Sequence, residues 1–176
     1  MVIGMKRLLS FLFACGLVAA IAAQPALAQE PKQIGKFGAW TAMTFQEDGH
    51  TACYVMSEPT RKEGNYTRRG EVYLLITHRP AQKSNGVVSF TAGYDYKPDG
   101  QVKVDVDGTG FDLFTKGDTA WARDGDDAKI VDAMTSGKTL VISGESARGT
   151  KTVDTYSLTG FGKALQAINK ACEVGG

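Results

Sequence analysis

Residues 101–107 carry the clearest structural signal in the chain, and they read Gln101-Val102-Lys103-Val104-Asp105-Val106-Asp107. In an extended chain the three valines point to one face, while the lysine and the aspartates point to the other. A strict period of two over this length is typical of a β-strand with one face in water and the other on a hydrophobic core. The stretch therefore predicts a half-buried strand.

Comparable segments occur on both sides of this strand. Short alternating or apolar runs lie at residues 37–43, 51–57, 71–77, 87–92, 111–115, 119–123, 139–146 and 152–158. Turns that contain glycine, at residues 47–49, 116–118 and 148–149, separate neighbouring runs. Many short strands at a spacing of about 8–12 residues favour a β-sandwich over a fold of alternating strands and helices.

A short helix is expected where the period of two stops. Asp126 or Asp127 is suited to cap it, because a short acidic side chain can accept a backbone N–H of the first turn. Ile130 and Met134 then follow at helical spacing, and Gly137 marks the end of the helix.

The chain ends in a second predicted helix, which covers residues 159–172 with Thr159 as the expected cap. Apolar residues recur on one side of this helix, as in a helix that packs on a core. They are Phe161, Ala164, Leu165, Ile168, Ala171 and Cys172. The sequence as a whole therefore predicts a mainly β sandwich with a short helix and a C-terminal amphipathic helix.

The first 28 residues have the pattern of a secretory signal peptide. Lys6 and Arg7 precede an uncharged apolar run at residues 8–23, and Ala26-Leu27-Ala28 forms a small-x-small motif, so we expect cleavage near Ala28. The run is shorter than the roughly 20 residues that span a bilayer as a helix. Residues 29–176 suffice for one sandwich domain, and we expect no membrane span in this mature chain.

The charge balance of the mature chain excludes one class of partner. Loss of Lys6 and Arg7 with the signal leaves 18 basic residues against 19 acidic ones. A nucleic-acid-binding protein needs a strong positive field, so we expect no nucleic-acid partner. Export predicts a periplasmic, cell-surface or secreted location.

Two cysteines, Cys53 and Cys172, remain after cleavage. Both lie on apolar faces, and an even number of cysteines in an exported chain is typical of a disulfide. In the chain-entropy model a bridge over about 120 residues stabilises the fold by about 5 kcal/mol. Two buried free thiols are the alternative, while a redox-active pair is disfavoured because no Cys-x-x-Cys motif is present. We predict a structural disulfide.

One segment is unusually basic for a nearly neutral chain. Residues 58–70 are rich in Pro, Gly and charge, and we interpret them as an exposed loop. As a candidate binding loop this segment would contact an anionic glycan, a lipid headgroup or an acidic partner; the alternative is a loop whose charges are only solvated. The residues of the candidate binding loop are Arg61, Lys62, Tyr66, Arg68 and Arg69.

The sequence contains no recognisable catalytic or metal-binding motif. His50 and His78 are its two histidines, without His-x-x-x-His spacing, and no Gly-x-Ser-x-Gly motif is present. The carboxylates of residues 124–127 could attract calcium but lack the spacing of a calcium-binding loop, so helix capping is favoured. Gly-Lys-Thr at residues 137–139 follows a helix, the wrong context for phosphate binding. We expect no metal, no cofactor and no catalytic residue.

Several stretches together resemble the invasion-associated locus B family of exported bacterial proteins. The opening Phe-Gly-Ala-Trp at residues 37–40 is one of them. The others lie at residues 53–59, 69–70, 77–80, 92–94, 111–114, 117–121, 146–150, 154–161 and 171–172. The resemblance implies an immunoglobulin-like β-sandwich in the periplasm or at the cell surface, a link to host-cell invasion, and no established catalytic site.

Two functions remain open on these grounds. The first is a non-catalytic protein that binds an unknown envelope or host protein, or an anionic glycan. The second is a small periplasmic hydrolase or metal-dependent enzyme with a site built from His50 or His78 and nearby carboxylates. The first is favoured because no nucleophile or metal motif supports the second.

Overall fold

The valine alternation forms the predicted strand, β7 (Val102–Val106), in the computed structural model, which describes residues 30–175. Val102, Val104 and Val106 are buried, and the charged residues between them are exposed. This strand lies inside the sheet, between β8 and β10. The predicted half-buried strand is therefore confirmed. The predicted signal peptide lies outside the described residues.

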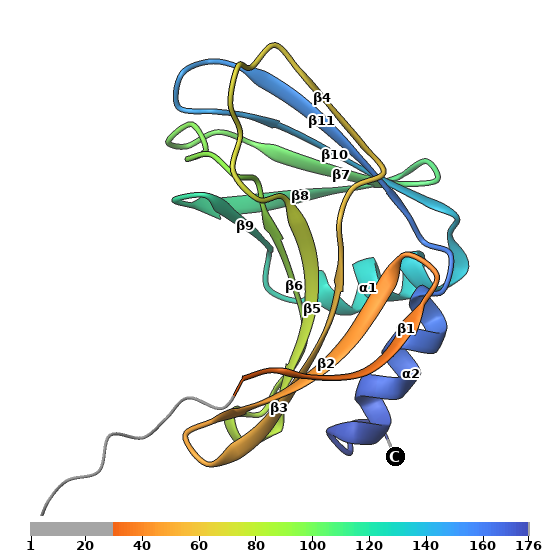
Figure 1. Ribbon diagram of the computed structural model, residues 1–176. Helices are drawn as coiled ribbons and strands as arrows, with labels where there is room; N and C mark the ends of the chain where they lie inside the picture. The colour runs from red at the N-terminus through yellow and green to blue at the C-terminus, as the bar shows by residue number, and fades with distance from the viewer. Residues whose placement is uncertain (1–29, 176) are drawn as a thin grey trace, which may run out of the picture.

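All eleven strands of the described chain belong to one antiparallel sheet (Figure 1). Their order in the sheet is β1-β2-β3-β5-β6-β9-β8-β7-β10-β11-β4. In chain order the remaining elements are β1 (Lys32–Phe37), β2 (Trp40–Glu47), β3 (His50–Ser57), β4 (Arg61–Gly64), β5 (Tyr73–Arg79), a 3-10 turn (Pro80–Gln82), β6 (Ser84–Thr91), β8 (Thr109–Lys116), β9 (Thr119–Ala122), α1 (Asp127–Ser136), β10 (Thr139–Glu145), β11 (Lys151–Ser157) and α2 (Phe161–Ala171).

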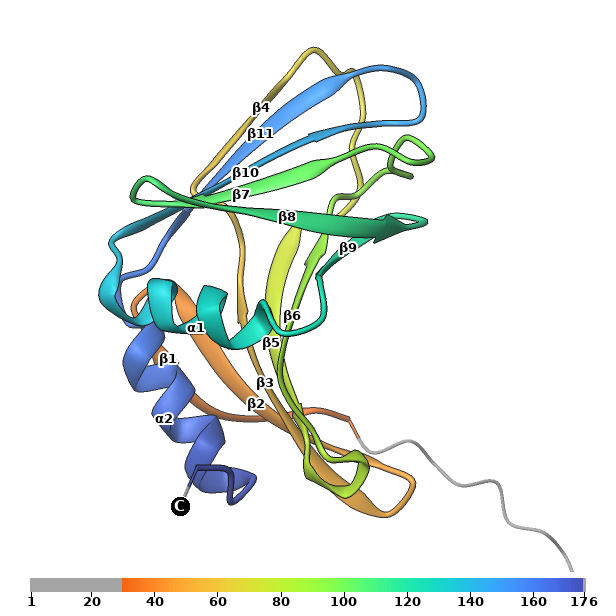
Figure 2. The ribbon, with the colours of Figure 1, turned by 180° about the vertical axis from the view of Figure 1, so that it is seen from behind.

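The continuous sheet bends so that its two halves pack on each other. Strands β2, β3, β5 and β6 run across the direction of β7, β8, β10 and β11 in both views (Figures 1 and 2). Phe90 on β6 and Tyr156 on β11 are separated by four strands in the sheet order, yet their ring centroids lie 6.4 Å apart. Trp40 Nε1 donates to the Ser157 carbonyl oxygen at 2.9 Å. The predicted mainly β sandwich with two helices is confirmed.

Both helices close the apolar interior of the bent sheet (Figure 2). α2 packs against β1, β2 and β3, where Phe161 meets Trp40 edge-on at a centroid distance of 4.8 Å. α1 packs on β6. Ala164 and Ile168 of α2 are fully buried, whereas Leu165 is half-buried and Ala171 is exposed. The predicted apolar face is therefore correct at its centre and too wide at its edges.

Neither helix is capped as predicted. α2 begins after Gly160, which adopts a left-handed conformation (φ 94°) where a Cβ would clash with the Phe37 carbonyl. Thr159 therefore cannot act as the cap. Asp126 occupies the N-cap position of α1, but no side-chain hydrogen bond caps that helix. The Asp127 carboxylate instead accepts the Val88 N–H at 2.7 Å, which ties α1 to β6.

The predicted disulfide is present. Cys53 on β3 is bonded to Cys172 at the end of α2, with the Cα atoms 6.1 Å apart. Both residues belong to the buried core. The bond fixes the end of the terminal helix to the sheet across 119 residues of sequence. No helix within residues 30–175 is both long and apolar enough to cross a membrane.

Candidate binding cleft

The five residues of the predicted binding loop occupy three different environments. Arg61 and Lys62 lie on β4, the edge strand that pairs with β11, and both are exposed. Arg68 is exposed on the segment that follows, and Tyr66 is half-buried. Arg69 points inward. The prediction of a loop throughout residues 58–70 is therefore wrong for residues 61–64, because β11 offers them a free strand edge to pair with.

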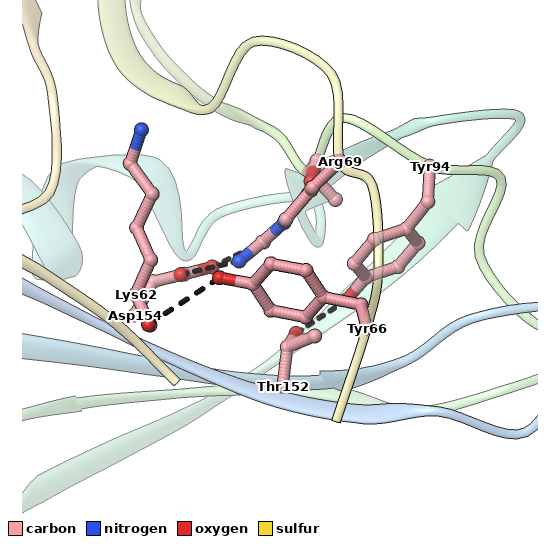
Figure 3. A network of polar contacts seen from close by, with 7 residues as sticks. Lys62, Tyr66, Arg69, Tyr94, Thr152 and Asp154 are labelled. Atoms are coloured by element: carbon pink, nitrogen blue, oxygen red, sulfur yellow. Dashed lines mark hydrogen bonds and ion pairs between the residues drawn. The ribbon is translucent and has the colours of Figure 1, made fainter. Parts of the chain in front are cut away.

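Arg69 forms a buried ion pair with Asp154 on β11 (Figure 3). Its two terminal nitrogens donate to the two carboxylate oxygens at 2.7 and 2.6 Å, and Nε donates to the Ala92 carbonyl at 2.7 Å. The side chains of Arg69 and Asp154 are only 4% and 6% exposed. Arg69 is therefore not an exposed cation of the candidate binding loop, as was predicted, since the fold uses it to neutralise a buried carboxylate.

Two tyrosine rings flank the Arg69 guanidinium (Figure 3). Its central carbon lies 5.5 Å from the centroid of Tyr66 and 5.1 Å from that of Tyr94, within the range of cation–π attraction. Burial by itself would lower the pKa of Arg69, but the hydrogen bonds and charge of Asp154 raise it above its usual value. Arg69 therefore remains cationic and joins two segments that are distant in sequence.

Both tyrosine hydroxyls are also engaged. The Tyr94 hydroxyl lies 2.6 Å from Thr152 Oγ1, and the Tyr66 hydroxyl donates to the Lys62 carbonyl at 3.3 Å. Burial raises the pKa of Tyr94, against the opposing effects of the Thr152 hydrogen bond and of Arg69. The neutral phenol is therefore the stable form near neutral pH. The position of each ring is therefore set by its contact with the Arg69 guanidinium and by the hydrogen bond of its hydroxyl.

Two glycines allow the segments that carry Arg69 and Tyr94 to touch. The Gly70 N–H donates to the Gly93 carbonyl at 2.9 Å. Gly93 has φ 72°, and a Cβ there would lie 2.6 Å from the Gly70 oxygen. Any side chain at this position would force the two backbones apart. The close approach thus depends on glycine itself.

A cleft of about 630 Å³ opens beside this network. Its walls are residues 65–70, residues 93–95, and residues 146–152, which form the turn after β10 and the start of β11. The Ala147 N–H donates to the Asp95 carbonyl at 2.8 Å, which joins the second wall to the third. The lining residues are Asn65, Tyr66, Thr67, Arg68, Arg69, Gly70, Gly93, Tyr94, Asp95, Ser146, Ala147, Arg148, Thr150 and Thr152. The volume lies in the range of small-ligand sites.

Sequence reasoning identified one wall of this cleft and missed the other two. Tyr94, Arg148 and Thr152 were not among the predicted site residues, because they lie in segments distant in sequence from residues 58–70. The sequence did contain a pattern that could have identified Asp154. In residues 151–157 every second side chain is buried, and Asp154 lies on this buried face between Thr152 and Tyr156. A carboxylate on the buried face of a strand requires a partner, and Arg69 is that partner.

The histidines of the alternative enzymatic hypothesis lie outside the cleft. His78 is buried, where its Nδ1 accepts the Gly86 N–H at 2.9 Å. Nε2 therefore carries the proton and donates to Asn169 Oδ1 at 2.8 Å. His50 is exposed beside Glu47, whose carboxylate is paired with Arg79 at 2.8 Å. The hydrogen bonds of His78 with Gly86 and Asn169 give this residue a structural role.

The acidic run at residues 124–127 is used within the fold. Asp126 accepts from Lys129 Nζ at 2.8 Å, and Asp127 binds the Val88 N–H. Burial raises the pKa of Asp127. Across residues 30–175, no cluster of three or more His, Cys, Asp or Glu side chains is arranged to hold a metal ion.

The fold and the cleft define a disulfide-linked β-sandwich with two helices and a polar, arginine-rich recess. The chain belongs to the invasion associated locus B (IalB) protein family, whose model matches residues 40–169. Its fold is similar to that in the crystal structure of invasion associated protein B from Bartonella henselae, with a TM-score of 0.57 and 16% sequence identity. That match covers 82% of this chain and 98% of the other. No curated protein matches the sequence.

Proposed function

We propose that this protein is an exported, non-catalytic binding protein of the bacterial cell envelope, which acts in the periplasm or at the cell surface after cleavage near Ala28. The observation that carries the proposal is the cleft, whose three walls come from distant parts of the chain and meet around one buried ion pair. Its partner is a component of the envelope or of a host. The name of the family associates its members with invasion.

Rigid walls support a binding role. The Arg69–Asp154 pair joins the first wall to β11, and the hydrogen bonds of Gly93 and Asp95 join the second wall to its neighbours. A site that is formed before its partner arrives loses little conformational entropy on binding. Preorganisation of this kind suits the recognition of a ligand.

Site-specific photocrosslinking in intact cells tests the binding role. A photoreactive amino acid replaces Thr67, which is exposed and lines the cleft, and in a matched control it replaces Lys116, which is exposed outside the cleft. We expect a discrete adduct from position 67, which an excess of protein without the photoreactive residue suppresses. We expect no adduct from position 116. Equal adducts at both positions, or none at either, would contradict a binding role for the cleft.

Export is tested separately by N-terminal sequencing of protein recovered from the cell envelope. Removal of the signal should leave Gln29 as the first residue. Recovery of the intact N-terminus from the cytoplasmic fraction alone would contradict the proposed location.

A further inference from the structure

The cleft contains two arginines whose charge is not used by the fold. Arg68 lies in the first wall and Arg148 in the third, and both are exposed. Neither forms an ion pair with any residue in the range 30–175. Arg69, in contrast, is neutralised by Asp154. The positive charge available to a ligand therefore comes from two different walls of the same recess.

Negative charge in the lining is limited to one residue. Asp95 is exposed in the second wall, and its backbone carbonyl already accepts the Ala147 N–H. Two free guanidinium groups against one carboxylate give the recess a positive balance in a protein that is close to neutral. Guanidinium groups bind carboxylate, sulfate and phosphate oxygens in a planar, two-point geometry. The recess therefore favours an anionic ligand.

The rest of the lining is polar and aromatic. Asn65, Thr67 and Thr150 present amide and hydroxyl groups, while Tyr66 and Tyr94 present partly exposed rings. Ala147 is the sole aliphatic side chain among the described lining residues. Hydroxyl and amide groups exchange hydrogen bonds with sugar hydroxyls, and tyrosine rings cover apolar faces that carry polar edges.

We propose that the cleft binds an anionic saccharide, with its acidic group between Arg68 and Arg148 and a sugar ring against Tyr66. This inference rests on the proposed function, because it names the ligand class of the same cleft. Arginine clusters also bind acidic peptides, so the rest of the lining decides between the two ligand classes. That lining has hydroxyl, amide and aromatic groups with one aliphatic side chain among the described residues, and it favours a saccharide.

Titration calorimetry of the exported, processed protein tests the ligand class. The probes are a galacturonic acid hexasaccharide and a heparin-derived hexasaccharide, with maltohexaose as the neutral control, sodium sulfate as the anion alone and hexaglutamate as the acidic peptide. We expect at least one acidic hexasaccharide to bind at least about tenfold more tightly than maltohexaose, sulfate or hexaglutamate. Its affinity should fall as salt rises from low to physiological concentration.

Variants locate the binding. Arg68→Ser and Arg148→Ser should each weaken the acidic hexasaccharide about tenfold, because a hydrogen bond to a charged group is lost. Tyr66→Leu should weaken it about fivefold through loss of the ring face. Arg123→Ser removes an exposed arginine outside the cleft and is the matched control, for which we expect unchanged affinity. Thermal melts of all four variants show that each remains folded.

The outcomes separate this inference from the proposed function. Equal binding of acidic and neutral hexasaccharides, tighter binding of hexaglutamate, or the same loss in Arg123→Ser as in Arg148→Ser would overturn the saccharide assignment. If no saccharide binds while position 67 still forms an adduct in cells, the ligand class is wrong and the binding function stands. If position 67 also forms no adduct, both proposals fail.

Discussion

Arg69 differs from the neighbouring cations because it is part of the folded interior. Its bidentate bond to Asp154, the Nε bond to the Ala92 carbonyl and the flanking rings of Tyr66 and Tyr94 leave little of it in water. A buried ion pair contributes little net stability against an apolar pair of the same size, but removal of one partner leaves an uncompensated charge. The cost of mutation therefore depends on which residue changes.

Arg69→Ser should lower the free energy of unfolding by about 3–5 kcal/mol, because it leaves the Asp154 carboxylate buried without a partner. The triple change Arg61→Ser, Lys62→Ser and Arg68→Ser removes only exposed charges and should cost less than about 1 kcal/mol. Chemical denaturation of both variants measures the contrast. Similar losses in the two proteins would show that Arg69 is not the residue that anchors this segment.

His78 predicts a pH dependence of stability. Burial lowers its pKa below the usual value of 6.5, against the opposing effect of the Asn169 hydrogen bond. As the pH falls, the unfolded chain binds a proton at this position before the folded chain does. The stabilisation from neutral His78 is therefore complete above the unfolded pKa and is lost as pH falls through the folded one.

We expect the melting temperature of the wild type to decrease as the pH falls from about 7.5 to 5. His78→Gln should show a smaller decrease over this range, whereas His50→Gln, at an exposed position, should behave as the wild type does. Melting curves at several pH values measure all three proteins. Parallel curves for wild type and His78→Gln would show that another group controls the acid response.

β4 shows how a strand can form without a strand-like sequence. Its residues Arg-Lys-Glu-Gly have low β propensity and are all exposed. Pairing with β11, together with the Thr60 N–H bond to the Thr155 carbonyl at 2.7 Å, holds it in place. Charged side chains on an outermost strand also discourage pairing with another chain. β4 is thus formed by its partner strand.

α2 provides a test of packing. Ile168→Ala should cost about 2–5 kcal/mol, because Ile168 is fully buried between the helix and the sheet. Leu165→Ala should cost less, since Leu165 is half-buried, and Lys163→Ala at an exposed position should cost less than about 0.5 kcal/mol. Urea denaturation gives the three values. Equal losses at positions 163 and 168 would contradict the docking of this helix.

The disulfide acts on the whole molecule, because it closes nearly the entire described chain between β3 and the end of α2. In the chain-entropy model the double variant Cys53→Ser and Cys172→Ser should lose about 5 kcal/mol relative to the oxidised protein. Equilibrium unfolding with and without reductant measures the effect. If the oxidised and reduced proteins unfolded at the same denaturant concentration, the bond would have no stabilising role.

The identity of most elements was determined by the sequence alone. The valine alternation of β7, the apolar centre of α2, the glycine turns and the two inward-facing cysteines are local patterns, since each depends on side-chain spacing within a few residues. They predicted a mainly β sandwich, its two helices and its disulfide. Resemblance across scattered short motifs predicted the family.

The cleft was decided only by the tertiary structure. Arg69 and Asp154 are 85 residues apart, and the three cleft walls come from separate segments of the chain. Whether a cation in a polar segment is solvated or buried depends on the strand that lies beneath it. The identity of that strand cannot be predicted from the periodicity of the chain. The bend that brings β11 over β6 creates that environment. Long-range pairing in the sheet therefore determined the site, while local spacing determined the elements that carry it.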